Sequence, residues 1–169
     1  MLSSPSASID ISLRTQEGLC VLTHHPLNVD EIISSVSDDT AGATAVFIGT
    51  TRNSFKGKVV TRLEYQAYSK LAIKTMADII RSAHKLASHS DEATSQIISC
   101  LIRCTVHHRL GTVPVGEPSI VIAVSSPHRK EAFAACELIL EEVKLKAQIW
   151  KREYYEGENE EEAEWKANG

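Results

Sequence analysis

The sequence lacks the motifs that mark the commonest nucleotide-binding and acyl-transfer enzymes. Neither GxxxxGK(S/T) nor GxGxxG occurs among its 169 residues, which argues against a glycine-rich loop that cradles a nucleotide. No GxSxG motif or Ser/His/Asp set is evident either, so serine-based acyl transfer has no support. Any chemistry must therefore depend on residues that converge from separate segments.

The sequence has no excess of positive charge and few aromatic residues. The 18 lysines and arginines face 22 aspartates and glutamates, the formal net charge is −4, and aromatics make up 5% of the chain. Proteins that bind nucleic acid or anionic membranes by charge carry basic patches, and single-strand binders add aromatics among them. We therefore expect no nucleic-acid or membrane partner, and any anion site must be a local cluster of cations.

Cysteine pairs and long apolar runs are missing as well. Cys20, Cys100, Cys104 and Cys136 form no CxxC motif, and no secretory signal pattern precedes them, which favours a reducing, cytoplasmic location. Cys100 and Cys104 fall on one face of an expected apolar strand, so they fit the core better than a metal site. No apolar run approaches the roughly 20 residues of a membrane span.

The apolar residues that are present predict strands interspersed with helices. We expect strands at 18–23, 42–51, 59–68, 96–108 and 118–126, and helices at 27–36, 69–87 and about 127–146. The 42–51 strand should be buried and should pair as a hairpin with 59–68. Asn28, Ser69 and Ser126 are the expected helix N-caps.

The spacing of apolar residues along the two long helices indicates which faces are buried. The expected stripes are Leu71, Met76, Ile79, Ile80, Ala83 and Leu86 in the first, and Phe133, Cys136, Leu140 and Val143 in the second. This order of elements predicts an α+β fold, a single domain with helices packed on a largely antiparallel sheet. Its expected parts are a flexible leader at 1–16, a catalytic domain at 17–153 and an acidic tail at 154–169. The composition of the tail is more typical of a solvated, mobile end than of a docking segment.

Three groups of cations stand at the ends of expected strands or on the last helix. Arg52 follows the second strand, His128 and Arg129 open the last helix, and the stretch VKLKAQIWKRE near the carboxyl end adds Lys144 and Lys151. Strand ends and helix starts are where distant segments converge, and the first turn of a helix attracts anions. Each group alone fits ordinary surface charge, but their joint placement predicts a pocket for an anionic ligand.

The stretch VKLKAQIWKRE permits two geometries. On a continuous helix, Lys144 and Lys151 lie two turns apart on one face, about 10 Å along the axis. If the helix instead ends near Gln148, Ile149 and Trp150 can anchor the chain while Lys151 bends back toward the same pocket. In either geometry, lysines held beside apolar surface suit proton transfer or nucleophilic attack.

The adjacent His107 and His108 raise a zinc hypothesis, which strand geometry opposes. Neighbouring residues on a strand point to opposite faces, so the two rings cannot ligate one ion without a bulge. No cysteine or carboxylate spacing typical of a zinc site accompanies them. We therefore expect no bound metal.

Five motifs together resemble the series found in the catalytic (large) subunit family of molybdopterin synthase, in its eukaryotic type without a fused partner domain. They are GATAVFIGTTRN, LEYQAY, HHRLGTVPVGE, SSPHRKEAF and LKAQIWKRE, in the family's order. The resemblance implies an enzyme of molybdenum cofactor biosynthesis that converts cyclic pyranopterin monophosphate to molybdopterin by installing a dithiolene. It implies no cofactor, and sulfur from the C-terminal thiocarboxylate of a small ubiquitin-like subunit.

The resemblance also implies an assembly and a set of site residues. The family's catalytic lysines fall on Lys144 and Lys151, and the assembly is a homodimer flanked by two small subunits, a heterotetramer in which the neighbouring chain supplies the His-Arg pair to each pocket. Gln148 stands where the family usually has proline, and with glutamine at this position the helix would end less sharply. The implied substrate-binding set is Phe47, Arg52, His128, Arg129, Lys144, Lys151, Arg152 and Glu153.

Two other classes of function remain open. A catalytically silent module that binds a ubiquitin-like tail would use the cations only to clamp a carboxylate. A general anion-binding or nucleic-acid-binding domain is disfavoured by the negative net charge. The presence of both lysines and of the His-Arg pair favours the sulfurtransferase, because a tail clamp alone does not need a second, substrate-facing set.

Overall fold

The chain folds into two larger β-sheets and two long helices in a computed structural model that describes residues 7–91, 96–98 and 100–169. In chain order the elements are β1 (Ile11–Arg14), β2 (Gly18–Thr23), α1 (Val29–Ser34), β3 (Ala43–Thr50), β4 (Ser54–Phe55), β5 (Lys58–Ala67), α2 (Ser69–Ala87), β6 (His89–Asp91), β7 (Gln96–Ile98), β8 (Arg103–Arg109), β9 (Gly111–Pro114), β10 (Pro118–Ser126), α3 (Arg129–Lys146), β11 (Ile149–Tyr155), the 3-10 turn η2 (Glu160–Glu162) and β12 (Lys166–Ala167).

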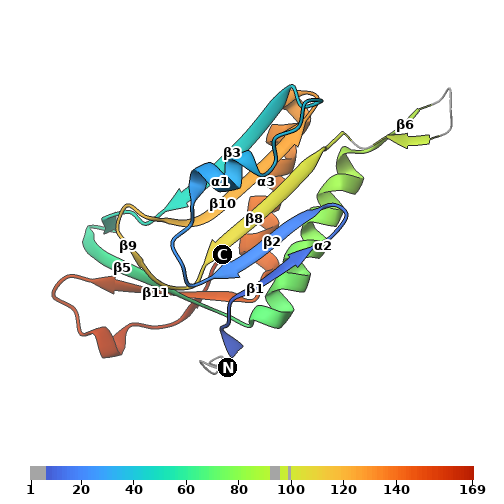
Figure 1. Cartoon of the computed structure of the whole chain (residues 1–169). Helices are drawn as coiled ribbons and strands as arrows, with labels where there is room; N and C mark the ends of the chain where they lie inside the picture. Colours follow the sequence, from blue (N-terminus) through green and yellow to red (C-terminus); the bar gives the residue numbers. More distant parts are fainter. Residues whose placement is uncertain (1–6, 92–95, 99) are drawn as a thin grey trace.

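The two sheets are joined through the strands that carry the predicted motifs. The first has the order β1-β2-β8-β10-β3 and is antiparallel except for the parallel pair β2 and β8. The second has the order β12-β11-β5-β4, with β9 also paired to β5. Figure 1 shows the second sheet crossing one end of the first, so the ends of strands from both sheets meet in one region.

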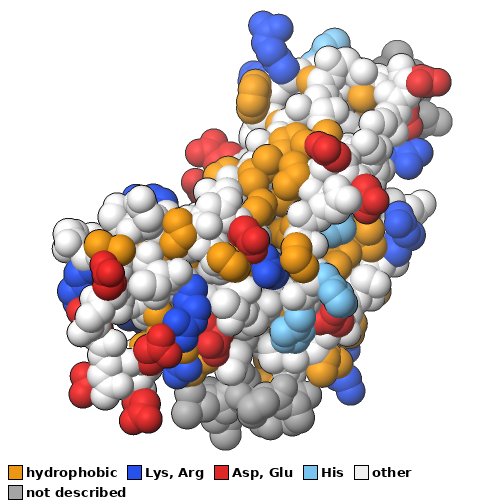
Figure 2. Space-filling view, turned by 60° about the vertical axis from the view of Figure 1, so that its left-hand side comes forward, with side chains coloured by type: hydrophobic (Ala, Val, Ile, Leu, Met, Phe, Trp, Pro, Cys, Tyr) orange, Lys and Arg blue, Asp and Glu red, His pale blue; other side chains and the backbone are white. Residues whose placement is uncertain are grey.

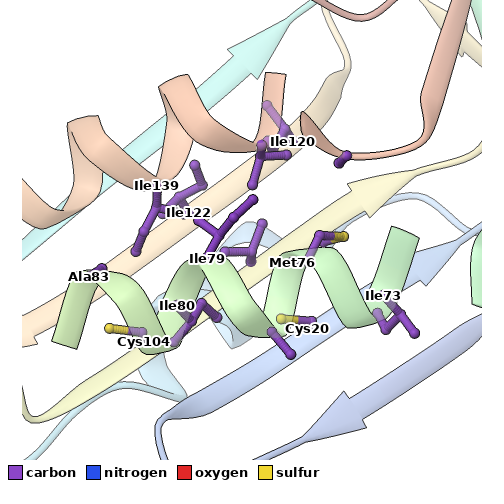
Figure 3. Packing of buried hydrophobic residues seen from close by; sticks show 14 of the residues in the cluster. Cys20, Ile73, Met76, Ile79, Ile80, Ala83, Cys104, Ile120, Ile122 and Ile139 are labelled. Carbon is purple, nitrogen blue, oxygen red and sulfur yellow. The ribbon is translucent and has the colours of Figure 1, made fainter. Parts of the chain in front are cut away.

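The core lies between the first sheet and the pair α2 and α3, which pack side by side on one face of it. Figure 3 shows Met76, Ile79 and Ile80 of α2 facing Ile122 of β10 and Ile139 of α3. Each aliphatic side chain of this size contributes about 1.5 to 3 kcal/mol when fully buried. This packing fixes α3 against the sheet through residues between Ala132 and Val143.

The predicted fold class is confirmed: the chain is a single α+β domain with helices on a largely antiparallel sheet. The N-cap of α1 is also confirmed, because the side-chain oxygen of Asn28 accepts a hydrogen bond from the backbone N–H of Glu31 at 3.2 Å. Among the residues described, no helix is long and apolar enough to cross a membrane.

The predicted hairpin between 42–51 and 59–68 is wrong. β3 pairs with β10, whereas β5 pairs with β11, β9 and β4, in the other sheet. β3 is an edge strand, so Val46 and Ile48 are 37% and 41% exposed and the strand is not buried as predicted. A turn brings two segments close, but long-range pairing decides which sheet each strand joins.

The apolar run predicted as one strand at 96–108 is divided into β7 and β8. Cys104 lies on β8 and is buried, as predicted, whereas Cys100 precedes the strand and is half-buried. Burial raises the pKa of Cys20 and of Cys104 to about 12. These two thiols therefore stay protonated near neutral pH and fit a packing role.

The predicted apolar stripes of α2 and α3 are confirmed in part, since Met76, Ile79, Ile80 and Ala83 of α2 and Cys136 and Val143 of α3 are buried. Leu71, Leu86 and Phe133 are 48%, 74% and 67% exposed. Hydrophobicity alone favours these large side chains, but the adjacent Ala72 and Ala132 face the core in place of Leu71 and Phe133. The buried faces are Ala72, Ile73, Met76, Ala77, Ile79, Ile80 and Ala83 in α2, and Ala132, Ala135, Cys136, Ile139 and Val143 in α3.

Two of the serines predicted as N-caps do not occupy the N-cap position, and their hydroxyls instead donate hydrogen bonds to backbone carbonyls of distant segments. Ser69 is the first residue of α2, and its hydroxyl donates to the carbonyl oxygen of Ile9 at 2.7 Å. Ser126 ends β10, and its hydroxyl donates to the carbonyl oxygen of Cys100 at 2.6 Å, while His128 occupies the N-cap position of α3. Serine hydroxyls serve both purposes, and the sequence does not distinguish them.

Both ends of the chain contain paired strands. Residues 11–14, inside the predicted leader, form β1 against β2. The carboxyl tail was expected to be a mobile, solvated end, but β11 continues to Tyr155 and β12 folds back to pair with it. The acidic residues of the tail are exposed, and two of them pair with β5, Glu158 with Lys58 at 2.6 Å and Glu160 with Arg62 at 2.8 Å.

Candidate active site

A cavity of about 200 Å³ lies where the two sheets and the end of α3 meet. Strands β3, β5, β8, β10 and β11 each contribute side chains, as does the last turn of α3. Its floor is partly apolar, and Gly49 packs closely there, because a Cβ at that position would stand 2.7 Å from Cγ2 of Ile120. The polar lining includes Arg52, Tyr65, His108, Ser119, Lys144, Lys151, Glu153 and Asn168.

Five residues of the predicted substrate-binding set line this one cavity: Phe47, Arg52, Lys144, Lys151 and Glu153. They come from β3, the loop after it, α3 and β11. Three cations face one carboxylate, so the cavity has an excess of positive charge although the whole chain is acidic. Such a local excess favours an anionic ligand.

The two lysines reach the cavity because α3 ends at Lys146 and β11 begins at Ile149. The chain therefore adopts the second geometry considered from the sequence, in which it bends back, and not the continuous helix. Ile149 is 1% exposed while Trp150 is half-buried, so Ile149 is the deeper anchor.

The connection between α3 and β11 is fastened without a proline. The side-chain oxygen of Gln148 accepts a hydrogen bond from the hydroxyl of Thr75 at 2.9 Å, and its carbonyl oxygen accepts from the backbone N–H of Tyr68 at 3.0 Å. Tyr68 is the N-cap residue of α2, and Thr75 lies in its second turn. These bonds hold the turn that places Lys151, and the helix ends before Gln148 is reached.

Strand register places Lys151 and Glu153 on the cavity side of β11. Lys151 is paired with Tyr65 of β5, and residues directly opposite each other on paired strands share a face. The ammonium nitrogen of Lys151 lies 3.6 Å from Oε1 of Glu153, whose Oε2 accepts a hydrogen bond from the hydroxyl of Tyr155. Burial and then this bond raise the pKa of Tyr155 to about 12, so it remains a donor to the carboxylate.

Arg152, predicted to bind substrate, does not line the cavity. It points to the opposite face of β11, as strand alternation requires. Its guanidinium lies 5.1 Å from the ring of Tyr154, 4.8 Å from that of Trp165, and 3.8 Å from the carboxylate of Glu64. In this chain Arg152 therefore holds the tail against the second sheet.

The structure does not bring His128 and Arg129 to the cavity of their own chain. Both are exposed at the start of α3, whereas Lys144 is in its last turn. Fifteen residues of helix separate Arg129 from Lys144, a rise of about 22 Å. Any contribution of this pair to a cavity must come from a second copy of the chain.

Sequence reasoning missed the neutral polar floor of the cavity. His108 is 1% exposed, its ring packs edge-on to that of Tyr65 at 4.8 Å, and the hydroxyl of Tyr65 lies 3.4 Å from that of Ser119. The pair His107 and His108 suggested a metal site and no role in this cavity, although alternation on a strand places one of the two histidines on the inner face. Asn168, the last member, carries no sequence signal that could have found it.

The buried His108 should make the protein less stable in mild acid. Burial is the largest cause of a pKa lowered to about 4, against an ordinary value near 6.5, and burial also lowers the pKa of His107 to about 4. Between these values the unfolded chain binds protons that the folded chain does not, so stability falls as pH falls from about 6.5 to 4. Each histidine contributes a slope of about 1 kcal/mol per pH unit.

Urea unfolding at pH 7, 6 and 5 measures this slope. The variant His108→Gln cannot titrate at this position, so its free energy of unfolding should change less steeply over the same interval, while His107 and His84, whose pKa values burial also lowers, still contribute. Equal slopes in the two proteins would show that the pKa of His108 is the same in the folded and unfolded chains, and would overturn the prediction.

A larger hollow of about 610 Å³ lies between β11 and the tail, but its charge is of the wrong sign for an anion. It is lined by Glu153, Glu158, Glu160, Glu162 and Glu164 with Lys166. Figure 2 shows acidic and basic side chains interleaved over one face of the molecule, without a broad basic surface there. The smaller cavity is therefore the better candidate for an anionic substrate.

Comparison with known proteins gives a consistent family relationship. A model of the MoaE protein family matches residues 22–146. The molybdopterin synthase catalytic subunit of Coccidioides immitis is 43% identical over 147 residues, which cover 87% of this chain and 69% of that protein. Molybdopterin synthase catalytic subunit 2 of Aedes aegypti is 44% identical over 147 residues, 87% of each chain.

Solved structures agree. Molybdopterin synthase from Staphylococcus aureus superposes with a TM-score of 0.73 at 29% identity, over 86% of this chain and 94% of that one. A complex of subunits 1 and 2 of the molybdopterin-converting factor from Helicobacter pylori contains a chain that matches with a TM-score of 0.62 at 20% identity, over 82% of this chain and 86% of that one. The second likeness is evidence for the fold alone.

Proposed function

The chain belongs to the MoaE family, whose members named above are molybdopterin synthase catalytic subunits, and we propose that its 200 Å³ cavity converts cyclic pyranopterin monophosphate to molybdopterin. The convergence of Arg52, Lys144 and Lys151 in one cavity carries this proposal. The substrate has a phosphate and the sulfur donor is a thiocarboxylate, so the site must receive two anions. Preorganised cations stabilise such groups without reorganisation.

The proposed reaction adds two sulfurs in sequence. In each addition a thiocarboxylate sulfur bonds to a substrate carbon and a C–O bond at that carbon breaks, its oxygen leaving either on the opened cyclic phosphate or as water. Water then hydrolyses the resulting thioester, which leaves the sulfur on the substrate and a carboxylate on the donor. Both steps move protons, which a lysine amine can accept and return. We assign this role to Lys144, at the end of α3, and anion binding chiefly to Lys151 and Arg52.

The sulfur donor in this proposal is the C-terminal tail of a small ubiquitin-like subunit. The structure of two molybdopterin-converting factor subunits in complex supports a partner of this kind. The proposed assembly is a homodimer with two small subunits, in which His128 and Arg129 reach the neighbouring chain's cavity. Val46 and Ile48, exposed on edge strand β3, leave apolar surface available for a subunit contact. We place the reaction in the cytoplasm, where reduced thiols such as those of Cys20, Cys104 and Cys136 persist.

The alternative is a non-catalytic module that only binds a ubiquitin-like tail. It accounts for the cations, but it gives no reason for a buried aromatic and histidine floor beneath them. Mixing the purified chain with a thiocarboxylated ubiquitin-like partner and the pterin precursor decides between the two. We expect dithiolene product, and tight binding of the partner without product would favour the alternative.

Replacing Arg129 by alanine should weaken binding of the pterin precursor. Loss of a hydrogen bond to a charged group costs about 1.5 to 3 kcal/mol, which corresponds to roughly a tenfold to hundredfold rise in Kd. Arg129 is exposed, so the fold should be intact. Titration calorimetry on the dimer measures the effect, with Lys130→Ala on the same exposed turn as the matched control. An unchanged Kd would remove Arg129 from the phosphate contacts.

A further inference from the structure

The end of the chain folds back onto the wall of the candidate active site. β12 pairs with β11, with Lys166 opposite Lys151. On the other face of β11 the guanidinium of Arg152 holds Trp165 at 4.8 Å from its ring. Figure 1 shows the carboxyl terminus brought back beside β8, which carries His108. The tail is thus part of the structure around the cavity.

Asn168 is the residue of this tail that enters the cavity wall. It is 7% exposed, and its backbone N–H donates to the carbonyl oxygen of Ile149 at 3.2 Å. Its side-chain nitrogen Nδ2 lies 3.2 Å from Nε2 of His108. The next residue, Gly169, passes beside Lys144, since a Cβ there would stand 3.1 Å from the carbonyl oxygen of that lysine.

The contacts of His108 fix where its proton lies. Nδ1 is 2.8 Å from the carbonyl oxygen of Arg109, and a carbonyl only accepts, so Nδ1 carries the hydrogen. In the neutral ring Nε2 then has a lone pair, which accepts a hydrogen from the amide of Asn168. Both ring nitrogens are satisfied in the uncharged form. An aspartate in place of Asn168 would offer only acceptors and would require a protonated ring.

We propose that Asn168 is a positioning residue of the catalytic cavity, which holds His108 uncharged and in a fixed orientation beside the reacting groups. This inference rests on the proposed function. A charge on His108 would repel the ammonium group of Lys144, and the same repulsion already contributes to the lowered pKa of His108. A neutral floor keeps the positive charge of the cavity on the side chains that meet the substrate.

Other charged and titratable groups surround the same space and set the background for any pH effect. The carboxylate of Glu153 is partly neutralised by Lys151, whose ammonium nitrogen is 3.6 Å away. Glu153 therefore does not supply a free counter-charge to His108. The facing groups are Tyr65 from β5, Lys144 from α3, Lys151 and Glu153 from β11, and Arg52 after β3.

The test replaces Asn168 by aspartate in the full chain with its small subunit. A carboxylate beside Nε2 favours the protonated ring, so the His108 resonances should titrate near pH 6 or above (about two pH units higher than in the unaltered chain), as followed by NMR without substrate. Turnover should fall about tenfold below that pH, with a new inflection in kcat that the unaltered chain lacks. The control is Asn159→Asp, the same change in the same tail at a residue whose side chain caps η2 and is remote from the cavity lining.

A second variant guards against a merely structural effect. Asn168→Ala removes the amide without adding charge, so kcat should fall about tenfold with KM nearly unchanged and with no new inflection. Thermal melting of both variants shows that they are folded. If Asn168→Asp leaves the His108 titration where it was, the contact is wrong. If the titration moves but kcat keeps its pH profile, the positioning role is overturned.

The readouts also separate this inference from the proposed function. The His108 titration is measured without substrate, so it decides the contact in any case. An unaltered chain that forms no dithiolene would overturn the proposed function and the role of Asn168 in turnover together. An active chain whose rate is indifferent to both Asn168 variants would overturn only the role of Asn168.

Discussion

Lys144→Arg should lose nearly all turnover, by about a hundredfold or more, although it keeps a positive charge in the cavity. A guanidinium remains protonated near neutral pH, so it can neither accept a proton nor act as a nucleophile. It can still attract a phosphate or a thiocarboxylate. If Lys144 moves protons, as proposed, charge alone does not rescue the rate.

Lys151→Arg is the matched comparison within the same cavity. Lys151 lies 3.6 Å from Glu153 on a strand, an arrangement suited to holding an anion beside a fixed carboxylate. Arginine can hold an anion with altered geometry, so this variant should lose only about tenfold. The two conservative changes therefore separate proton transfer from electrostatic binding.

Single-turnover formation of the dithiolene measures both variants without a contribution from product release. Lys144 is exposed and Lys151 is only partly buried, so melting temperatures should change little and serve as the control for folding. A Lys144→Arg enzyme with a near-native single-turnover rate would eliminate the chemical role and leave only the electrostatic one.

The convergence of cations could be predicted because it depends on local rules. Arg52 follows a strand that has a clear apolar pattern, and Lys144 lies in the last turn of a helix whose length is indicated by its apolar spacing. The ends of such elements gather at the edge of a sheet in most arrangements of the strands. The position of Lys151 required one more fact, that the helix ends before Gln148.

The parts that failed depend on contacts distant in sequence. The pairing of β5 with β11 joins segments about 90 residues apart, and no turn pattern near β5 announces it. Asn168 reaches His108 across 60 positions of sequence through a strand of only two residues. Arg152 was assigned to the substrate by resemblance, but alternation along β11 could have directed it away from Lys151 once β11 was known to be a strand.

The separation of Arg129 from Lys144 leads to the most demanding test of the shared site. Neither Arg129→Ala nor Lys144→Arg chains should support turnover at low precursor concentration, because each lacks one part of every cavity. When the two chains are mixed and allowed to exchange, about half of the dimers are mixed, and one cavity in each has both native residues. Activity should therefore recover to about a quarter of the native value.

Lysine variants supply the control that makes this recovery specific. Lys144 and Lys151 line the same cavity of a single chain, so mixing Lys144→Arg with Lys151→Ala leaves every cavity with one altered lysine. That mixture should stay inactive even when mixed dimers form. Native mass spectrometry counts the mixed dimers in both experiments. If the Arg129 and Lys144 variants form mixed dimers without regaining activity, His128 and Arg129 do not serve the neighbouring cavity. About 22 Å of helix separates these two residues from the cavity of their own chain, so they would then take no part in the reaction.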